Sequence, residues 1–366
     1  MPHIDWLVRT HGVPLGAAGF AVSCVMLPGA LLGWVFGGAS DRFGAKPVAI
    51  AGLLLAAAAS FAGGYADSFP VLVVLRIVEG AGYTLLVVAG TVIAARVVPG
   101  RSALALSAWS SFAPIGFALG QWAAAYAPDP PLPVIGAVHA AVLGLAALAL
   151  HFSVEQIRAG KDESSSRDVL RHAPAQRTAL AFGAVCAVLL ASIALAPVVL
   201  ASRFQLPLAH VASLTALAAL PAIVGRIVPG WLLDRGFAAF TVFAAASAAA
   251  ALALAGALVA PVPFALAVVC FGAFQILAGA LPGLLSAMLP HVAPTPAQLG
   301  AVSGLCSQSV NIGNLIGPPL ALAVYAAAGA GIAVLMLVLA LAASVLAIAR
   351  LAVFRRDLRE RSGQAS

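Results

Sequence analysis

The sequence predicts an all-α integral membrane protein of two pseudo-symmetric helical bundles, with about eleven transmembrane helices. Three observations support this class. The 366 residues are 63% hydrophobic and only 8% charged, and the mean hydropathy is +1.07, which leaves too little charge for a soluble domain. Eleven apolar runs have about the length that spans a bilayer. A short charged motif also occurs twice, far apart in the chain.

The repeated motif is Gly-x-x-x-Asp-Arg, and its second copy begins 193 residues after the first. Repetition at that distance indicates a duplicated unit. Glycine permits a sharp turn and a close helix approach, while an Asp–Arg pair at a helix end can bind a neighbouring helix terminus. The sequence therefore predicts a tight turn between two apolar runs at each copy. The residues concerned are Gly37, Asp41, Arg42, Gly44 and Lys46 in the first copy, and Gly230, Asp234 and Arg235 in the second.

The first copy resembles, position by position, the G-x-x-x-D-R-x-G-x-K/R loop of the major facilitator superfamily (MFS), and the second is similar to the degenerate copy in that family's C-terminal half. The resemblance implies a gating motif that latches the two halves and helps to hold the outward-open state. Asp41 should then contact a helix terminus of the other half, with Arg42 and Lys46 nearby. Asp41→Asn should reduce transport, and Asp234→Asn should matter less.

Five apolar runs precede a charged segment and six follow it. The charged segment, 153–177, is the predicted cytoplasmic linker. It separates an N-terminal bundle (1–152) from a C-terminal six-helix bundle (178–353) that ends in a basic cytoplasmic tail (354–366). The predicted runs are 15–36, 47–65, 69–97, 103–125, 132–152, 178–202, 209–233, 240–260, 263–289, 299–328 and 332–353.

The imbalance of five runs against six suggests that the first helix of the usual twelve is missing. The 193-residue offset would place the counterpart of 178–202 largely before residue 1. On this expectation the reading frame upstream of Met1 encodes about 15–25 more apolar residues. An in-frame stop there would instead favour a truncated relative.

Charged and polar side chains inside apolar helices are costly, so they are the candidate functional groups. Arg76 and Glu79 lie three residues apart on one helix face. They form either a proton- or substrate-responsive pair or a structural ion pair. The run Arg76-x-x-Glu79-Gly80-x-Gly82 is weakly similar to a segment of bacterial cyanate-permease-like facilitators.

Arg226 is a third intramembrane charge, eight residues before Asp234. Arg226-x-x-x-Gly230 resembles the arginine with which monocarboxylate-type facilitators hold a substrate carboxylate, and a guanidinium matches a carboxylate in a bidentate way. The other interpretation is that Arg226 extends to the inner interface or stabilises the Asp234 turn. If Asp234 and Glu79 are otherwise engaged, Arg226 is the best cation for an anionic substrate.

Amides and glycines add further candidates. The stripe of Gln308, Asn311 and Asn314 either lines a cavity or hydrogen-bonds neighbouring helices. Gln275 is a candidate cavity residue. Three Gly-x-x-x-Gly pairs predict packing seams, at Gly33 and Gly37, Gly116 and Gly120, and Gly313 and Gly317.

These features favour a secondary active transporter of a small solute. The resemblance implies alternating access with a coupling proton, and an organic anion is the solute class that fits Arg226 and Arg76 best. The rivals are a non-transporting or regulatory MFS-like membrane protein and a channel. The sequence contains no H-E-x-x-H, G-x-S-x-G, P-loop or paired metal-ligand motif, so neither an enzyme nor a cofactor is expected. The net charge of +7 is attributed to membrane-flanking loops rather than to nucleic acid binding.

The distribution of Lys and Arg predicts topology. If the Asp41 turn is cytoplasmic, the predicted outer segments hold only Arg9 and Arg203, and all other membrane-flanking basic residues face the cytoplasm. A C-terminal reporter that fluoresces only in the cytoplasm should therefore light up in the inner membrane. A dark reporter combined with an active periplasmic phosphatase fusion at the same point would reverse the orientation.

Overall fold

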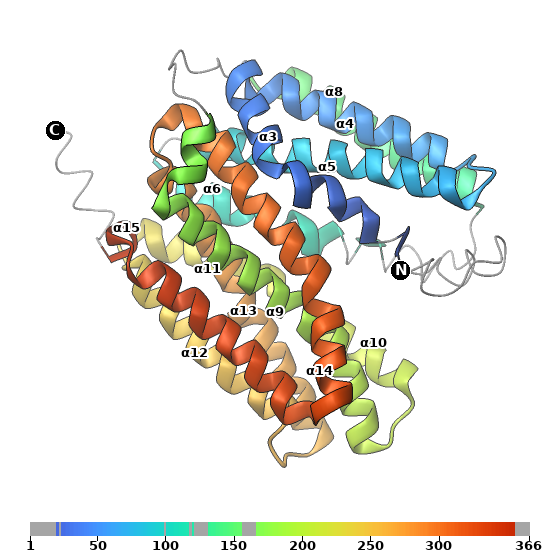
Figure 1. The fold of residues 1–366 in the computed structure, drawn as a ribbon, viewed down its shortest axis with the longest axis vertical. Helices are drawn as coiled ribbons and strands as arrows, with labels where there is room; N and C mark the ends of the chain where they lie inside the picture. The colour runs from blue at the N-terminus through green and yellow to red at the C-terminus, as the bar shows by residue number, and fades with distance from the viewer. Residues whose placement is uncertain are drawn as a thin grey trace. The chain divides into compact units, whose positions relative to one another are not determined.

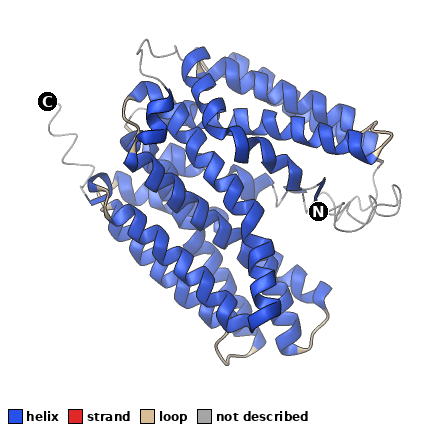
Figure 2. Cartoon of the chain, viewed as in Figure 1, coloured by secondary structure: helices blue, strands red, loops and turns tan. Residues whose placement is uncertain are grey.

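The computed structural model describes residues 20–21, 23–98, 100–116, 119–120, 131–155 and 166–355. Within these ranges the regular structure is helical (Figure 2), and nine segments are long and apolar enough to cross a membrane. The predicted all-α membrane fold is therefore confirmed. The expectation of a missing first helix concerns residues 1–19, which lie outside the described part of the chain.

Figure 1 shows the described helices, coloured in the order in which they occur along the chain. In chain order they are η1 (Cys24–Met26), α3 (Leu27–Phe43), α4 (Ala45–Gly63), α5 (Phe69–Val97), α6 (Ser102–Trp109), α8 (Leu132–Ser153), η2 (Ser166–Arg171), α9 (Ala173–Phe204), α10 (Leu208–Ala219), α11 (Ala222–Asp234), α12 (Ala239–Leu258), α13 (Phe264–Val292), η3 (Pro296–Gln298), α14 (Leu299–Ala349) and α15 (Ala352–Arg355).

The chain forms two compact units. The first comprises Met1–Ile93, Gly116–Arg171 and Pro294–Asn311, and the second comprises Ala94–Ile115, His172–Ala293 and Ile312–Ser366. Each unit thus includes a segment from the other half of the sequence. The start of α14 belongs to the first unit, and α6 belongs to the second. The predicted sequence boundaries of the two bundles stay a prediction.

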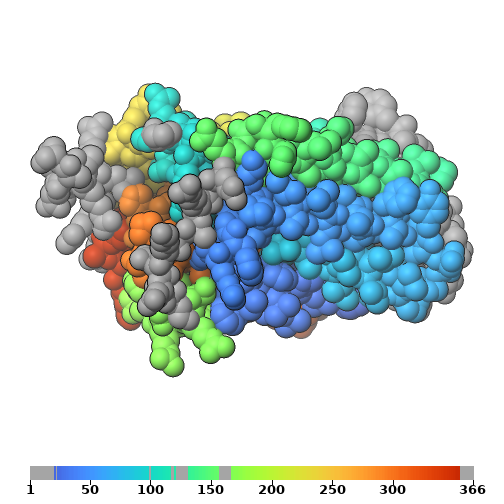
Figure 3. All heavy atoms as spheres, turned by 90° about the horizontal axis from the view of Figure 1, so that it is seen from above, coloured from blue at the N-terminus to red at the C-terminus, as the bar shows by residue number. Residues whose placement is uncertain are grey.

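In the first unit, α8 lies against α4 along its length. In the space-filling view of Figure 3 the green surface of α8 runs along the blue surface of this unit. Gly136 makes the approach possible, because a Cβ there would lie 2.6 Å from the Ser60 carbonyl oxygen. The opposite face of α8 is exposed and apolar, as expected for a helix that faces lipid.

The long helix α14 contains 51 residues, which is about 76 Å of α-helix and more than twice what a bilayer core requires. Gly329 divides it with non-helical backbone angles (φ 80°, ψ 177°), which glycine adopts without steric cost. This break agrees with the two runs predicted there, 299–328 and 332–353.

The charged turns lie later than predicted. Helix α3 continues through Gly37 and Asp41 to Phe43, so the reversal falls on Gly44 alone (φ 93°). Ala, Ser, Asp and Arg are all compatible with a helix, and only Gly44 provides the left-handed conformation. In the second copy, α11 likewise continues to Asp234 and Gly236 has a φ of 90°.

Two further predicted runs are interrupted. The run predicted over 209–233 breaks at Leu220 and Pro221 into α10 and α11, and the run over 103–125 turns at Ser110 and Ser111. Pro221 lies 193 residues after Pro28, which stands in the first turn of α3 directly after η1. Both copies of the repeat therefore begin at a proline that follows a break and end at a positive-φ glycine.

The first predicted glycine seam is confirmed between α3 and the start of α14. A Cβ added at Gly33 would lie 2.5 Å from the Gly304 carbonyl oxygen, and one at Gly37 would overlap the Gly300 carbonyl. In the second unit, a Cβ at Gly317 would lie 2.7 Å from the Ala187 carbonyl oxygen of α9, which confirms the seam at Gly313 and Gly317. The third predicted seam, at Gly116 and Gly120, makes no close contact among the described residues, because no described atom lies within 4 Å of an added Cβ at either glycine.

Gly304→Leu should therefore destabilise the protein strongly. A Cβ at this position would lie 2.9 Å from the Gly37 Cα, and overpacking a tight site costs about 1–3 kcal/mol. The measurement is the thermal unfolding midpoint of the purified protein in detergent. Gly144→Leu on α8 is the matched control, because a Cβ there meets no described atom within 4 Å. Equal midpoints for the two variants would contradict a close α3–α14 seam.

Candidate functional site

Asp41 binds the N-terminus of a second helix within the first unit. Its Oδ1 accepts a hydrogen bond from the Gly300 N–H at 2.7 Å, and its Oδ2 accepts one from the Ala301 N–H at 2.7 Å. These amides belong to the first turn of α14, where backbone N–H groups have no partner within their own helix. The expected contact of Asp41 with a helix terminus is therefore present, and the positive end of the helix dipole favours the carboxylate there.

The two basic residues of the first copy have separate partners. Lys46 Nζ donates to the His151 carbonyl oxygen at 2.7 Å, in the last turn of α8, so the ammonium group stabilises a helix C-terminus. Arg42 is exposed, and its guanidinium lies 5.2 Å from the centre of the Phe43 ring. The motif thus connects α3 to the start of α14 through Asp41, and α4 to the end of α8 through Lys46.

The second copy repeats this arrangement within the second unit. A Cβ at Gly230 would lie 2.7 Å from the Leu104 Cα in the first turn of α6. The Asp234 carboxyl group interacts with the backbone of Leu104 and with the charge of Arg101. Arg235 stacks on Trp231, with its guanidinium carbon 3.5 Å from the ring centre. Asp41 and Asp234 therefore both act on the first turn of another helix.

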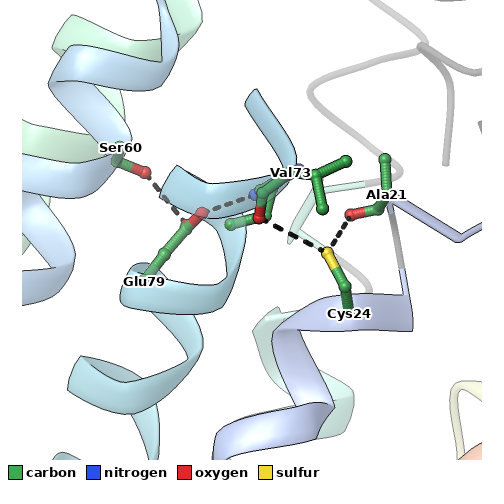
Figure 4. Close-up of polar contacts among 6 residues, drawn as sticks. Ala21, Cys24, Ser60, Val73 and Glu79 are labelled. Carbon is green, nitrogen blue, oxygen red and sulfur yellow. Dashed lines mark hydrogen bonds and ion pairs between the residues drawn. The ribbon is translucent and has the colours of Figure 1, made fainter. Parts of the chain in front are cut away.

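Arg76 and Glu79 form the ion pair predicted from their spacing. Arg76 Nη1 lies 2.7 Å from Glu79 Oε2. The Ser60 hydroxyl of α4 donates to Glu79 Oε1 at 3.0 Å (Figure 4). The Cys24 thiol lies on the other side of α5 and contacts the Val73 carbonyl at 3.9 Å. The arginine side chain is 39% exposed and the glutamate 17%, so the pair remains partly accessible.

The amide stripe on α14 divides into different environments. Gln308 bonds to the backbone of α3, donating to the Leu31 carbonyl and accepting from the Trp34 N–H, each at 3.4 Å. Asn311 donates to the Ser307 carbonyl of its own helix at 2.8 Å. These contacts favour the packing interpretation for both residues, and Asn314 is half-buried farther along α14.

Gln275 occupies an unusual position on α13. Its side chain is only 1% exposed, and neither atom of its amide group has a hydrogen-bond partner within the described residues. It lies eleven residues, or about 16 Å, from the start of a membrane-spanning helix. A buried amide without a protein partner is typical of a position that binds water or a ligand.

Arg226 is not the uncommitted cation that the sequence suggested. Its Nη1 donates to the Ser110 carbonyl oxygen at 2.6 Å, at the point where α6 ends. The Ser107 hydroxyl of the same helix donates to the Arg226 carbonyl oxygen at 2.7 Å. The sequence reasoning missed Ser107 and Ser110, although three serines within the five residues from 107 to 111 of an apolar run were a usable signal.

Comparison with known proteins gives a family and a fold. The Major Facilitator Superfamily profile matches residues 1–294. The structure is similar to that of the human organic anion transporter TETRAN, with a TM-score of 0.69 at 18% identity over 94% of this chain and 88% of that one. It is also similar to the E. coli fucose:proton symporter FucP, with a TM-score of 0.68 at 19% identity over 90% of each chain. No curated protein sequence matches the chain.

Asp41→Asn should lower stability more than Asp234→Asn. The substitution removes the charge at the α14 N-terminus and turns one of two accepting oxygens into a donor that faces a backbone N–H. Losing such a charge-assisted bond costs about 1.5–3 kcal/mol. Thermal unfolding of the two variants, each first shown to insert into the membrane, makes the comparison. A larger loss for Asp234→Asn would contradict this ranking.

Proposed function

The chain belongs to the major facilitator superfamily, and we propose that it is a secondary active transporter that carries a small organic anion across the inner membrane by alternating access. The same proposal places the C-terminus in the cytoplasm, following the Lys and Arg distribution. Cyanate-permease-like members remain the subfamily that the Arg76–Gly82 segment favours.

The observation that carries the anion proposal is the guanidinium of Arg226 inside a membrane-spanning segment, Leu208–Asp234. One of its hydrogen bonds goes to a backbone carbonyl, which is a neutral acceptor. A carboxylate binds a guanidinium through shorter and stronger, charge-assisted bonds, often two at once. An anionic solute would therefore compete well for this group.

Other contacts are consistent with transport of this kind. Protonation of Glu79 would remove its charge attraction to Arg76, which makes this pair the proposed site of the coupling proton. Gln275 is proposed to bind the solute or the water that accompanies it. The similar structures include an organic anion transporter and a proton symporter, and this supports the class of function rather than a particular substrate.

The motif residues are proposed to act as gates. Asp41 joins α3, from the first half of the sequence, to α14, from the second half. Asp234 joins α11 to α6 in the corresponding way. Breaking helix-terminus contacts of this kind would let α3 part from α14 and α11 part from α6 at these helix ends, which is the proposed gating movement.

Counterflow in proteoliposomes tests the function. Vesicles that contain purified protein and unlabelled lactate, succinate or benzoate should take up the labelled compound transiently against its gradient. Counterflow requires a carrier, so its absence alongside simple leakage would indicate a channel. Absence of any flux for these anions and for neutral sugars would favour the non-transporting alternative.

Arg226→Ala should weaken the affinity for the transported anion by more than tenfold, because two charge-assisted hydrogen bonds are lost. Arg226→Lys should restore only part of it, because lysine lacks the planar fork. The measurement is the KM for counterflow. Arg96→Ala, which removes an exposed arginine at the end of α5, is the matched control. An unchanged KM in Arg226→Ala would refute the anion proposal.

A further inference from the structure

Helices α6 and α11 are joined by a small hydrogen-bond network that we call the α6–α11 clasp, formed by Ser107, Ser110, Arg226 and Gly230. All four residues lie in the second compact unit. The Ser107 side chain is completely buried and Ser110 is 6% exposed, so water does not compete freely for their bonds.

The Ser107 hydroxyl is inserted into the backbone ladder of α11. It donates to the Arg226 carbonyl at 2.7 Å and accepts from the Gly230 N–H at 3.1 Å. These are the two groups that pair with each other in a regular α-helix. Pro229, which cannot donate a backbone hydrogen bond, lies between them and weakens the ladder at this turn.

The Arg226 side chain closes the clasp into a ring. Its guanidinium donates to the Ser110 carbonyl at 2.6 Å, and the Ser110 hydroxyl donates to the Ser107 carbonyl at 2.6 Å. Ser110 is the C-terminal cap of α6, so the cation also meets the negative end of that helix dipole. The backbone of Arg226 is thus held by α6 while its side chain stabilises the end of the same helix.

The surrounding packing leaves little freedom for this arrangement. On α13, a Cβ added at Gly283 would lie 3.0 Å from the Ser107 hydroxyl and would overlap the Arg226 carbonyl. A Cβ at Gly230 would lie 2.6 Å from the Ser107 Cβ. Because the backbones are this close, the guanidinium reaches Ser110 only while α6 and α11 stay together.

We propose that Ser107 and Ser110 hold Arg226 in the closed α6–α11 clasp, and that an anion bound by the guanidinium opens this clasp. The inference rests on the proposed function, since it takes Arg226 as the anion-binding group. An anion that takes the Nη1 donor of Arg226 displaces the Ser110 carbonyl, which removes the cap of α6 and one of the links between the helices. Substrate binding is in this way coupled to separation of α6 from α11.

The coupling is measured as a distance between α6 and α11. Spin labels are placed at Val98→Cys, just before α6, and Phe237→Cys, just after α11; both residues are exposed and lie outside the clasp. The background has the four native cysteines replaced, and the protein is held in lipid nanodiscs. Pulsed electron–electron double resonance then gives the distribution of distances between the two labels as the concentration of lactate, succinate or benzoate is increased.

Without any anion, Arg226→Ala should lengthen or broaden the distance distribution, because the side-chain link is gone. The anion that shows counterflow should change the parent protein in the same direction. Ser107→Ala should lower the anion concentration at half-maximal change by about two- to tenfold, because a weaker clasp enlarges the binding-competent fraction. Ser192→Ala is the matched control, since its hydroxyl is equally buried but bonds only within its own helix.

The outcomes separate the two proposals. An unchanged distance in a monodisperse Arg226→Ala protein would overturn the clasp, whatever the protein transports. Counterflow of an anion that leaves the parent distance unchanged would overturn the coupling while the proposed function stands. If no anion is carried and Arg226→Ala still lengthens the distance, the proposed function fails and the clasp is supported. A half-maximal concentration in Ser107→Ala that is equal to or higher than that of the parent would exclude a role for Ser107 in holding the clasp closed.

Discussion

The ends of helices set the main constraint on this chain, because every helix leaves backbone groups unpaired at its ends and the bilayer core offers no water to those that lie within it. Side chains satisfy several of these groups. Asp41 takes two amides at the start of α14, Lys46 takes a carbonyl at the end of α8, and Arg226 takes the carbonyl that ends α6. Charged residues that look expensive in an apolar sequence are thus used at the points where the backbone itself is polar.

Close backbone approach makes these contacts possible. Gly37 brings α3 against Gly300, one turn before Asp41 reaches the same helix, and Gly230 brings α11 against Leu104, one turn before Asp234. The glycine and the carboxylate therefore work as a pair separated by four residues, which places them on one helix face. This explains why the repeated motif has that spacing, and it gives the two copies the same structural task.

The sequence predicted what depends on composition and local pattern. The membrane class and most of the apolar runs followed from the apolar content, and the contact of Asp41 with a helix terminus followed from the resemblance of the repeated motif to the family's loop. The sequence did not predict which glycine adopts a positive φ, or which residues distant in the chain bind each other. Nothing in the run from Gly37 to Lys46 distinguishes a turn at Gly37 from one at Gly44, and the bond from Arg226 to Ser110 joins residues that are 116 apart in the chain.

The short helix α4 has a consequence for the lipid that surrounds the protein. Its 19 residues extend about 28 Å, close to the thickness of a bilayer core, and Gly44 and Gly64 limit it at its two ends. Longer helices such as α9, with 32 residues, fit a thin membrane by tilting and a thicker one by tilting less, but α4 cannot lengthen. Hydrophobic mismatch therefore falls first on α4, whose N-terminus adjoins the turn that holds Asp41 in place. Bilayer thickness becomes a variable that acts directly on the contact between α3 and α14.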